Sequence, residues 1–412
     1  MKTIRFFTLG LVLCWLGTVS LQAADWAEFR GSNHGHAEAK SLPLKWSATE
    51  NVKWKIEVPG TGWSSPALFK DRIYLTSAIT NDAGGQSLHA LCVDAKDGKI
   101  VWNTEVFRPQ TSPGIHKKNS HASPTAVIEK DRVYVHFGHQ GTACLDLKGK
   151  VIWKNDTIKY QPVHGNGGSP VIVDDILFFS CDGAKDPFMV ALDKQSGSIR
   201  WKVPRETTAK RAFSFSTATV ITVNGQKQII SPGSGVVCAL NPKDGKELWR
   251  CRYGEGYSVI PKPVYANGML FLSSGYDRPI AMAIRVDANK GDVTDTHVAW
   301  SLPKGGPNTP SMLVVGDEFY MVSDGGIATC ADAKTGSVHW QERIGGNYSA
   351  SPIYAAGRIY FQSEQGMGVV LKPGKTFEKL AENNLAERTL ASYAVGNKCL
   401  FIRGEQHLFR IE

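Results

Sequence analysis

Tryptophan recurs along this chain at nearly constant spacing, and no other feature limits the possible folds as strongly. Seven tryptophans are separated by 40 to 51 positions: Trp54, Trp102, Trp153, Trp201, Trp249, Trp300 and Trp340. A self-similar period of about 40 to 50 residues is typical of propeller blades and of solenoids. The chain is therefore expected to repeat one small structural unit many times.

Each tryptophan from Trp102 onward ends a short phrase that consists of a turn and the strand segment after it. Four of these phrases have the same length: Asp94 to Trp102, Asp193 to Trp201, Asn241 to Trp249 and Asp332 to Trp340. In each phrase Asp or Asn opens the turn, and a glycine four positions later supplies the positive φ that a tight hairpin needs. Asp146 to Trp153 is one residue shorter, and Asp287 to Trp300 carries an insertion, as loops tolerate.

Two apolar strands precede each phrase, and the first often follows a Ser-Pro pair such as Ser65-Pro66, Ser123-Pro124 or Ser351-Pro352. Short apolar runs bounded by Gly, Asp and Asn are strand signals. The second strand occurs eight times, centred near Tyr74, Tyr134, Phe178, Ile229, Phe271, Tyr320, Tyr360 and Phe401. Because four strands make one blade, we predict an all-β, eight-bladed β-propeller with four-stranded antiparallel blades.

Two of the eight blades lack a tryptophan-bearing outer strand after their second strand. For the seventh blade, the stretch from Phe377 to Leu385 occupies that register, although its propensity is helical. The eighth blade ends the chain with three strands, whereas the segment from Val52 to Val58 has the outer-strand signature and no blade before it. We therefore predict that the N-terminal strand closes the ring, because an open ring would expose an unpaired edge.

The first residues have the pattern of a secretory signal peptide. Lys2 and Arg5 precede an apolar run, and Ala23 and Ala24 end it, which predicts cleavage and export to the periplasm or the medium. Leu13 precedes Cys14, where a lipidation signal needs a small residue, so no lipid anchor is expected. The predicted organisation is a signal peptide at 1–23, a leader at 24–50 and a propeller at 51–412.

The charge and hydropathy of the remaining chain argue against nucleic-acid binding and against a transmembrane span. Without residues 1–23, 45 basic and 38 acidic residues leave a net charge near +7, and no run of Lys or Arg exceeds Lys117-Lys118. A nucleic-acid-binding surface is therefore not predicted. No second long apolar stretch follows the N-terminal one, so no transmembrane span is predicted.

Seven cysteines follow the predicted signal peptide, and their positions indicate packing more than bonding. Cys92, Cys144 and Cys330 each stand two residues before an aspartate at one point of the repeat, and Ala191 and Ala239 occupy the same point in other copies. A position that accepts Cys or Ala is a small core position, where a free thiol behaves as a small apolar group. Metal binding by thiols in separate blades is the weaker interpretation.

The repeat resembles the PQQ-like (pyrroloquinoline quinone repeat) propeller family over nearly the whole mature chain. The segments DWAEFRGSN at 25–33, LPLKW at 42–46 and GWSSP at 62–66 are similar to a subgroup of secreted bacterial propellers. One branch of the family contains quinoprotein dehydrogenases, which oxidise alcohols or sugars with PQQ and calcium. The other resembles the periplasmic scaffold protein of the outer-membrane β-barrel assembly machinery, which binds protein partners through loops on one face.

The residues present favour the scaffold branch. Enzymes of the methanol-dehydrogenase type carry two adjacent cysteines over the quinone, whereas this sequence has no adjacent cysteine pair and no CxxCH haem site. The resemblance therefore implies a non-enzymatic exported binding or scaffold protein without a cofactor. Its partners would be envelope or extracellular proteins, or a saccharide or peptide. The alternative is a divergent PQQ-dependent oxidoreductase of alcohols or sugars.

Candidate binding residues lie just before or at the first strand of the blades, where a propeller forms a funnel. They are Trp63, His121, His164, Asn166, Arg211, Tyr257, Asn308, Tyr348 and Arg388. Such aromatic, imidazole, amide and guanidinium groups suit a sugar, an anion or a peptide terminus, but each is equally able to cap a strand or bind channel water. We assign no catalytic residue and no metal, because two histidines without a nearby carboxylate are a poor metal site.

Overall fold

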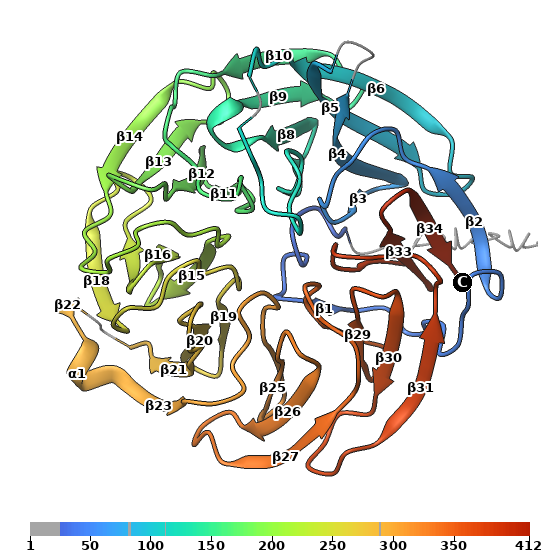
Figure 1. Cartoon of the computed structure of the whole chain (residues 1–412). Coiled ribbons are helices and arrows are strands. Elements are labelled where there is room, and N and C mark those ends of the chain that lie inside the picture. Colours follow the sequence, from blue (N-terminus) through green and yellow to red (C-terminus); the bar gives the residue numbers. More distant parts are fainter. Residues whose placement is uncertain (1–24, 81–83, 112, 288–289) are drawn as a thin grey trace, which may run out of the picture.

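The computed structural model describes residues 25–80, 84–111, 113–287 and 290–412. Eight antiparallel sheets surround one axis, so the predicted eight-bladed propeller is confirmed (Figure 1). The predicted signal peptide, with Cys14, lies outside the described residues. Within those residues no helix is long and apolar enough to span a membrane.

In every blade the strands run from the centre of the ring outward. Blade 1 contains β3 (Ala67–Phe69), β4 (Arg72–Thr80), β5 (Gln86–Asp94) and β6 (Ile100–Phe107). Blade 2 contains β7 (Val127–Glu129), β8 (Arg132–His136), β9 (Thr142–Asp146) and β10 (Val151–Asn155). Blade 3 contains β11 (Val171–Val173), β12 (Ile176–Cys181), β13 (Phe188–Asp193) and β14 (Ile199–Pro204). Blade 4 contains β15 (Thr219–Val223), β16 (Gln226–Gly233), β17 (Val236–Leu240) and β18 (Glu247–Arg252).

The second half of the chain repeats this order. Blade 5 contains β19 (Val264–Ala266), β20 (Met269–Ser273), β21 (Ala281–Arg285) and β23 (Val298–Leu302). Blade 6 contains β24 (Leu313–Val315), β25 (Glu318–Val322), β26 (Ile327–Asp332) and β27 (Val338–Arg343). Blade 7 contains β28 (Ile353–Ala355), β29 (Arg358–Gln362), β30 (Met367–Leu371) and β31 (Lys379–Asn384). Blade 8 contains β32 (Ala394–Gly396), β33 (Cys399–Arg403) and β34 (His407–Ile411), with β2 (Val52–Glu57) outside.

Both predictions about the incomplete blades are confirmed. β31 is the outer strand of blade 7 despite its helical propensity, because it pairs with β30. β2 pairs antiparallel with β34, which places Lys55 opposite Phe409 and joins the two ends of the chain in one blade. The insertion predicted between Asp287 and Trp300 forms β22 (Gly291–Asp292), which pairs with β18 of blade 4, and α1 (Thr294–His297).

The outer tryptophans join neighbouring blades. Each packs on the turn of the next blade and donates its indole N–H to a backbone carbonyl there. The six pairs are Trp54 with Ala95, Trp102 with Leu147, Trp153 with Lys194, Trp201 with Pro242, Trp300 with Ala333 and Trp340 with Gly374, at 2.9 to 3.1 Å. Trp249 is different, because it is fully buried and bonds Gln228 of its own blade.

The repeated turn has the predicted chemistry. Asp94 Oδ1 accepts the backbone N–H of Lys96, and Gly98 adopts a φ of 77°. The same glycine leaves room for Trp54, because an added Cβ would lie 3.0 Å or less from atoms of Trp54 and Ile56. The turn therefore needs glycine both for its backbone conformation and for the tryptophan of the preceding blade.

The cysteines lie in the core between blades, as predicted. Cys92 pairs with Tyr74, and Cys144 with Tyr134, whereas Ala191 takes the equivalent place opposite Phe178. Cys92, Cys144, Cys181, Cys238, Cys251, Cys330 and Cys399 are all buried free thiols. Small side chains at this position leave space for the aromatic ring across the strand pair.

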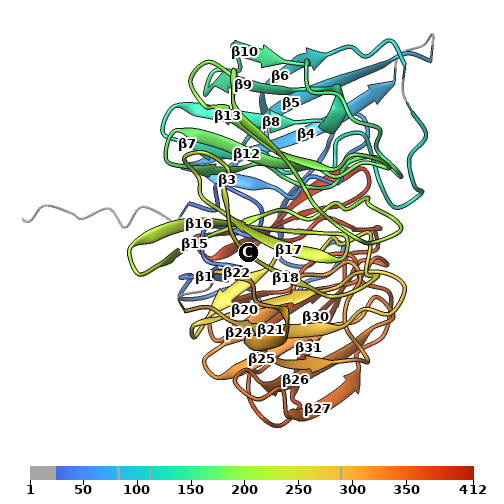
Figure 2. The ribbon, with the colours of Figure 1, turned by 90° about the vertical axis from the view of Figure 1, so that its left-hand side faces the viewer.

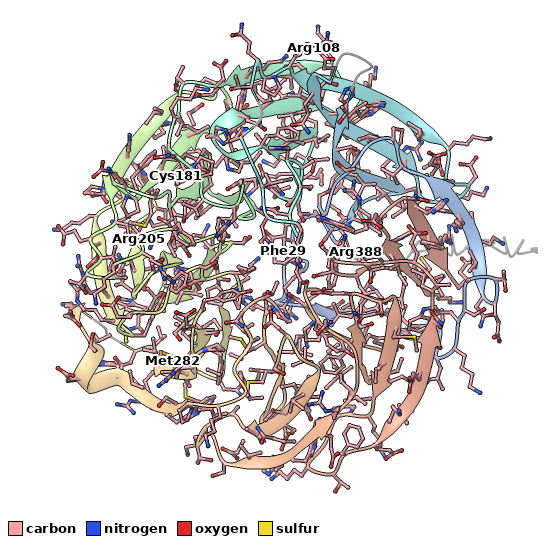
Figure 3. All side chains as sticks on the ribbon, viewed as in Figure 1. Phe29, Arg108, Cys181, Arg205, Met282 and Arg388 are labelled. Carbon is pink, nitrogen blue, oxygen red and sulfur yellow. The ribbon has the colours of Figure 1, made fainter. Side chains whose placement is uncertain are left out.

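The leader crosses the central channel before it reaches the outside of the ring. Trp26 exchanges backbone hydrogen bonds with Leu68 of blade 1, and β1 (His36–Ala37) pairs in parallel with β28 of blade 7. Phe29, between these contacts, lies at the centre of the ring (Figure 3). In the side view of Figure 2, β1 lies toward the left-hand face, and long connecting segments extend at the right-hand face. The leader therefore obstructs the channel from one face.

Candidate functional site

The site is a cavity of about 420 Å³ around the propeller axis, with Phe29 of the leader among its lining residues. Every blade contributes side chains to its wall. Cavities of this size hold small organic ligands. We call this cavity the funnel.

A ring of hydroxyl groups forms the lower tier of the funnel. We call the residue two positions before each innermost strand the hydroxyl position. Seven blades have Ser or Thr there: Ser65, Thr125, Ser169, Thr217, Ser311, Ser351 and Ser392. The backbone N–H of the residue at this position donates to the hydroxyl at the same position of the next blade, at 2.9 to 3.0 Å. Seven such hydrogen bonds occur around the ring, and one of them joins blade 8 to blade 1. These bonds explain why the repeat retains a hydroxyl here.

Lys262 is the one exception in this ring. The backbone N–H of Lys262 donates to the Ser311 hydroxyl, as in the other blades. However, Lys262 has no hydroxyl that could accept the backbone N–H of Thr217 in the preceding blade. Ser216 and Thr219 instead donate to the carbonyls of Pro261 and Pro263, at 2.9 and 2.7 Å. Thus the junction between blades 4 and 5 lacks both the hydroxyl link and the hydrogen bond from a tryptophan indole to the turn of the next blade.

The upper tier lies two residues before the hydroxyl position, and it differs in almost every blade. Its members all line the funnel: Trp63, Ser123, Gly167, Phe215, Ile260, Thr309, Ser349 and Leu390. The structure here corrects the assumed equivalence of Ser123-Pro124 with Ser65-Pro66. Val127 pairs with Tyr134 as Ala67 pairs with Tyr74, so the true counterpart of Ser65 is Thr125.

Aromatic rings cover one side of the funnel in a continuous series. The centroids of His164 and Phe213 are 5.6 Å apart, and those of Phe213 and Tyr257 are 5.5 Å apart. His116 extends the series at one end and Tyr276 at the other, at 5.7 and 6.2 Å. This aromatic wall comes from blades 3 to 5 and from the segment between β6 and β7, so loops far apart in the sequence build one surface.

Residues 113–126, which lead into β7, reach toward the axis of the ring (Figure 1). Lys118 of this segment donates to Glu364 Oε1 of blade 7 at 2.8 Å, and Ser349 donates to the same oxygen at 2.6 Å. Burial and the neighbouring His164 lower the pKa of His116, which keeps this imidazole neutral at neutral pH. The ion pair of Lys118 with Glu364 joins the segment before β7 of blade 2 to blade 7.

The other cations at the mouth are also paired. Arg211 lies over the ring of Tyr257 at 4.4 Å and within 3.7 Å of Asp277. Arg388, labelled beside the axis in Figure 3, lies over Trp63 at 5.4 Å and bonds Glu405 at 2.9 Å. The funnel consequently presents aromatic rings in edge-to-face contact and hydroxyl groups, and each of these cations is paired with a carboxylate.

The structure brings five of the nine predicted residues to the funnel. Trp63, His164 and Tyr257 line it. Arg211 and Arg388 stand over two of those rings at the mouth, as described above. The structure shows the position of these five residues, and their role in binding stays a prediction.

The other four predicted residues lie outside the lining. Three of them stand three residues before the hydroxyl position, one residue from the upper tier: Asn166, Asn308 and Tyr348. Because successive side chains of extended backbone point in opposite directions, these three point away from the funnel. Asn166 accepts a bond from Tyr160 at 3.0 Å, and Tyr348 is fully buried in the core. His121 is half-buried, and burial lowers its pKa.

Sequence reasoning missed most of the upper tier and most of the aromatic wall. The signal that finds the tier is its constant distance from the Ser or Thr of the repeat, once blade 2 is aligned on Thr125. Phe213 and Tyr276 carry no such signal, because they lie on loops of different length. Asp324 holds the chain beside the funnel, since its carboxylate accepts hydrogen bonds from Asn308 N–H and from the Thr309 hydroxyl. Burial raises its pKa.

Comparison with known proteins assigns the family. A family model described as "Outer membrane protein assembly factor BamB" matches residues 44–185 and 186–394. The chain belongs to this BamB-like family. The solved BamB from Moraxella catarrhalis superposes with a TM-score of 0.62 at 13% identity, covering 87% of this chain and 96% of that one.

Quinoproteins also resemble this BamB-like propeller. A europium-containing methanol dehydrogenase superposes with a TM-score of 0.66 at 10% identity, over 92% of this chain and 89% of that one. The quinohemoprotein alcohol dehydrogenase ADH IIB of Pseudomonas putida is 25% identical over 201 residues, 44% of this chain and 27% of that enzyme. The chain thus spans less than a third of the length of this relative. The superpositions show a shared fold alone.

The funnel wall does not match the donor set of a PQQ and calcium site. Calcium takes six to eight oxygen ligands, among them carboxylates. Among the described residues that line the funnel there is no Asp or Glu. Nowhere in the described parts of the chain do three or more His, Cys, Asp or Glu side chains form a group that could hold a metal ion. We therefore derive no chemical step through this cofactor.

Proposed function

We propose that this BamB-like propeller is an exported, non-enzymatic binding protein of the cell envelope, and that its funnel binds an uncharged, hydroxyl-rich ligand such as a saccharide unit. One observation carries the proposal. A tier of repeated hydroxyls, interrupted only at Lys262 among the described blades, lies under a tier that differs in nearly every blade, and the aromatic wall lines the same funnel. Variation at one register of an internal repeat is expected where the repeat serves a ligand instead of the fold.

The hydroxyl ring suits a ligand that accepts hydrogen bonds. A Ser or Thr hydroxyl has one donor and two acceptor sites. In the hydrogen bonds of the described residues, the six funnel-lining members of the ring use only an acceptor site: Ser65, Thr125, Ser169, Ser311, Ser351 and Ser392. Their O–H groups remain available to a ligand oxygen. An aromatic wall on the other side offers apolar contact to a sugar face.

The pairing of the cations argues for an uncharged ligand. A carboxylate ligand gains most from a cation that lacks a partner. Lys118, Arg211 and Arg388 each already contact a carboxylate. An anionic ligand would have to compete with Glu364, Asp277 or Glu405, whereas a neutral saccharide leaves all three pairs intact.

A saccharide-binding screen tests this proposal. The mature chain is applied to an array of neutral and charged glycans, and hits are measured by isothermal titration calorimetry. We expect binding of neutral glycans, with at least a tenfold loss of affinity in Tyr257→Ala. Phe69→Ala, which changes an aromatic side chain outside the funnel, is the matched control. Binding that survives Tyr257→Ala unchanged, or that is limited to anionic ligands, would contradict the proposal.

The family description favours a second candidate, a scaffold for protein partners in the envelope. Exposed rim loops outside the funnel would then be the binding surface. Affinity purification from envelope extract with the wild-type chain and with Tyr257→Ala separates the two candidates. A specific protein captured equally by both would support the scaffold and not the saccharide receptor.

The quinoprotein relatives support the remaining alternative, an oxidoreductase of alcohols or sugars with PQQ and calcium. The purified protein is incubated with PQQ and calcium, and retention after gel filtration and dye-linked oxidation are measured. Tight retention together with turnover would replace the receptor proposal by this one.

A further inference from the structure

Two cationic side chains are buried beneath the funnel, where the leader meets blades 5 to 7. Arg30 of the leader has no exposed surface, and Lys262 is 4% exposed. Arg30 Nη2 donates to the carbonyls of Met312 and Pro352, at 2.7 and 3.2 Å. Lys262 Nζ donates to the carbonyl of Phe29 at 3.2 Å. Both side chains therefore lie against residues at the inner end of the same group of blades.

Most of the donors on these two groups have no acceptor. A guanidinium has five N–H donors and an ammonium has three. Arg30 Nε and Nη1 are buried without a partner in the structure. Lys262 makes one hydrogen bond, so two of its three donors also remain. A buried N–H without an acceptor costs about 1 to 3 kcal/mol, which makes such a cluster of unused donors unusual.

No carboxylate forms an ion pair with either side chain among the described residues. Neither Arg30 nor Lys262 takes part in any of the ion pairs there, although Glu28 is near enough to affect Lys262. The other titratable neighbours, His34 and His36, add no negative charge. Burial holds the pKa of His34 at about 3, with smaller contributions from Lys262 and Arg30. A buried charge that lacks a counter-charge is strongly unfavourable.

Arg30 remains charged at neutral pH. Burial lowers the pKa of Arg30 to about 9, and it also lowers the pKa of Lys262. A guanidinium with a pKa near 9 is still protonated at pH 7. The repeat shows that Lys262 is a departure and not a requirement of the blade, because Ser or Thr serves at this position in the other seven blades.

We propose that Arg30 and Lys262 hold a small, singly charged inorganic anion of the halide class beneath the funnel floor. The anion accepts the unused N–H donors of both groups and neutralises part of their charge. It thereby fixes the leader between blades 5, 6 and 7. A monatomic anion suits this place because it accepts hydrogen bonds from any direction and the two side chains are closed off from solvent.

Anomalous diffraction tests the site directly. Crystals of the wild-type mature protein are grown in sodium bromide, and data are collected at the bromine absorption edge. We expect an anomalous peak within hydrogen-bonding distance of both Lys262 Nζ and the Arg30 guanidinium. Water without anomalous signal at that place, or bromide only at exposed surface sites as an adventitious ion only, would overturn the proposal.

A solution experiment gives an independent readout. At constant ionic strength, replacing sodium gluconate by sodium chloride should raise the Tm of the wild type by about 2 °C or more, because an anion that binds only the folded state stabilises it. Lys262→Ser restores the hydroxyl of the repeat and should abolish the chloride-dependent shift, as should Lys262→Met, which removes the charge at similar volume. Thr217→Ser is the matched control and should keep it. An equal shift in all four proteins would contradict the site.

Discussion

The outer rim and the funnel of this propeller use the same repeat in opposite ways. At the rim, one position carries tryptophan in blade after blade, and six of these side chains make the same contact with the next turn. In the funnel, the upper-tier position carries seven different residue types in the eight blades, and only Ser123 and Ser349 are alike. Identity within the repeat marks positions that hold the ring together, and variation marks the upper tier of the funnel.

The largest expected effect comes from removing one outer contact. Trp201 is 8% exposed and packs on the turn of blade 4. Trp201→Ala should lower the free energy of unfolding by about 3 to 5 kcal/mol, because it removes a large buried side chain. Trp63→Ala, at a half-buried funnel position, should lower it by about 1 kcal/mol. Urea unfolding of both variants measures the difference, and equal losses would remove the distinction between rim and funnel.

A pair of glycines in blade 4 isolates the tryptophan contact from backbone strain. Gly245 and Gly225 have φ of 72° and 79°, so alanine is strained at both. An added Cβ at Gly245 would lie 2.6 Å from Trp201, whereas Gly225 has open space. We expect Gly245→Ala to cost about 3 kcal/mol and Gly225→Ala about 1 kcal/mol. Similar Tm values for the two variants would show that the rim contact adds little.

Part of the loss of stability in acid should come from a buried histidine of blade 2. Burial, aided by His139, lowers the pKa of His136 to about 3, so the folded state keeps this imidazole neutral. Below pH 6.5 the unfolded chain binds a proton that the folded chain excludes, and stability falls with pH from 6.5 toward 3. His136→Gln should remove about 2 kcal/mol of this loss between pH 7 and 5. Urea unfolding at both pH values measures it, and an unchanged pH slope would contradict this account.

The smallest effect on stability, with a clear effect on binding, is expected in the upper tier. Phe215 lines the funnel and is half-buried. Phe215→Ala should weaken ligand binding about tenfold while it changes the free energy of unfolding by about 1 kcal/mol. Calorimetric titration with the best ligand of the array measures the first value. Loss of stability without loss of affinity would place Phe215 with the structural positions.

Sequence reasoning was strongest where the physics is local. The turn from Asp94 to Trp102 contains its own cap, its glycine and its strand, and repetition multiplied that signal until the eight blades could be counted. Ring closure by the segment from Val52 to Val58 followed from the same signature, and the observed strand β2 covers Val52–Glu57 of it. These features are decided within about ten residues.

The site was harder to predict because its parts meet across the ring. Arg30 bonds a carbonyl 282 positions away, and Lys118 pairs with a carboxylate 246 positions away. No local pattern announces such contacts. Asn166, Asn308 and Tyr348 were chosen one residue from the positions that line the funnel, and in extended backbone one residue reverses the direction of a side chain.

A crystal structure of the wild-type protein with its best glycan tests the central claim most directly. The account predicts that the sugar ring stacks on the aromatic wall at Phe213 and Tyr257, with its oxygens bonded to the hydroxyls of the lower tier. A glycan bound at the outer rim or on blade edges, with the funnel holding water alone, would contradict it.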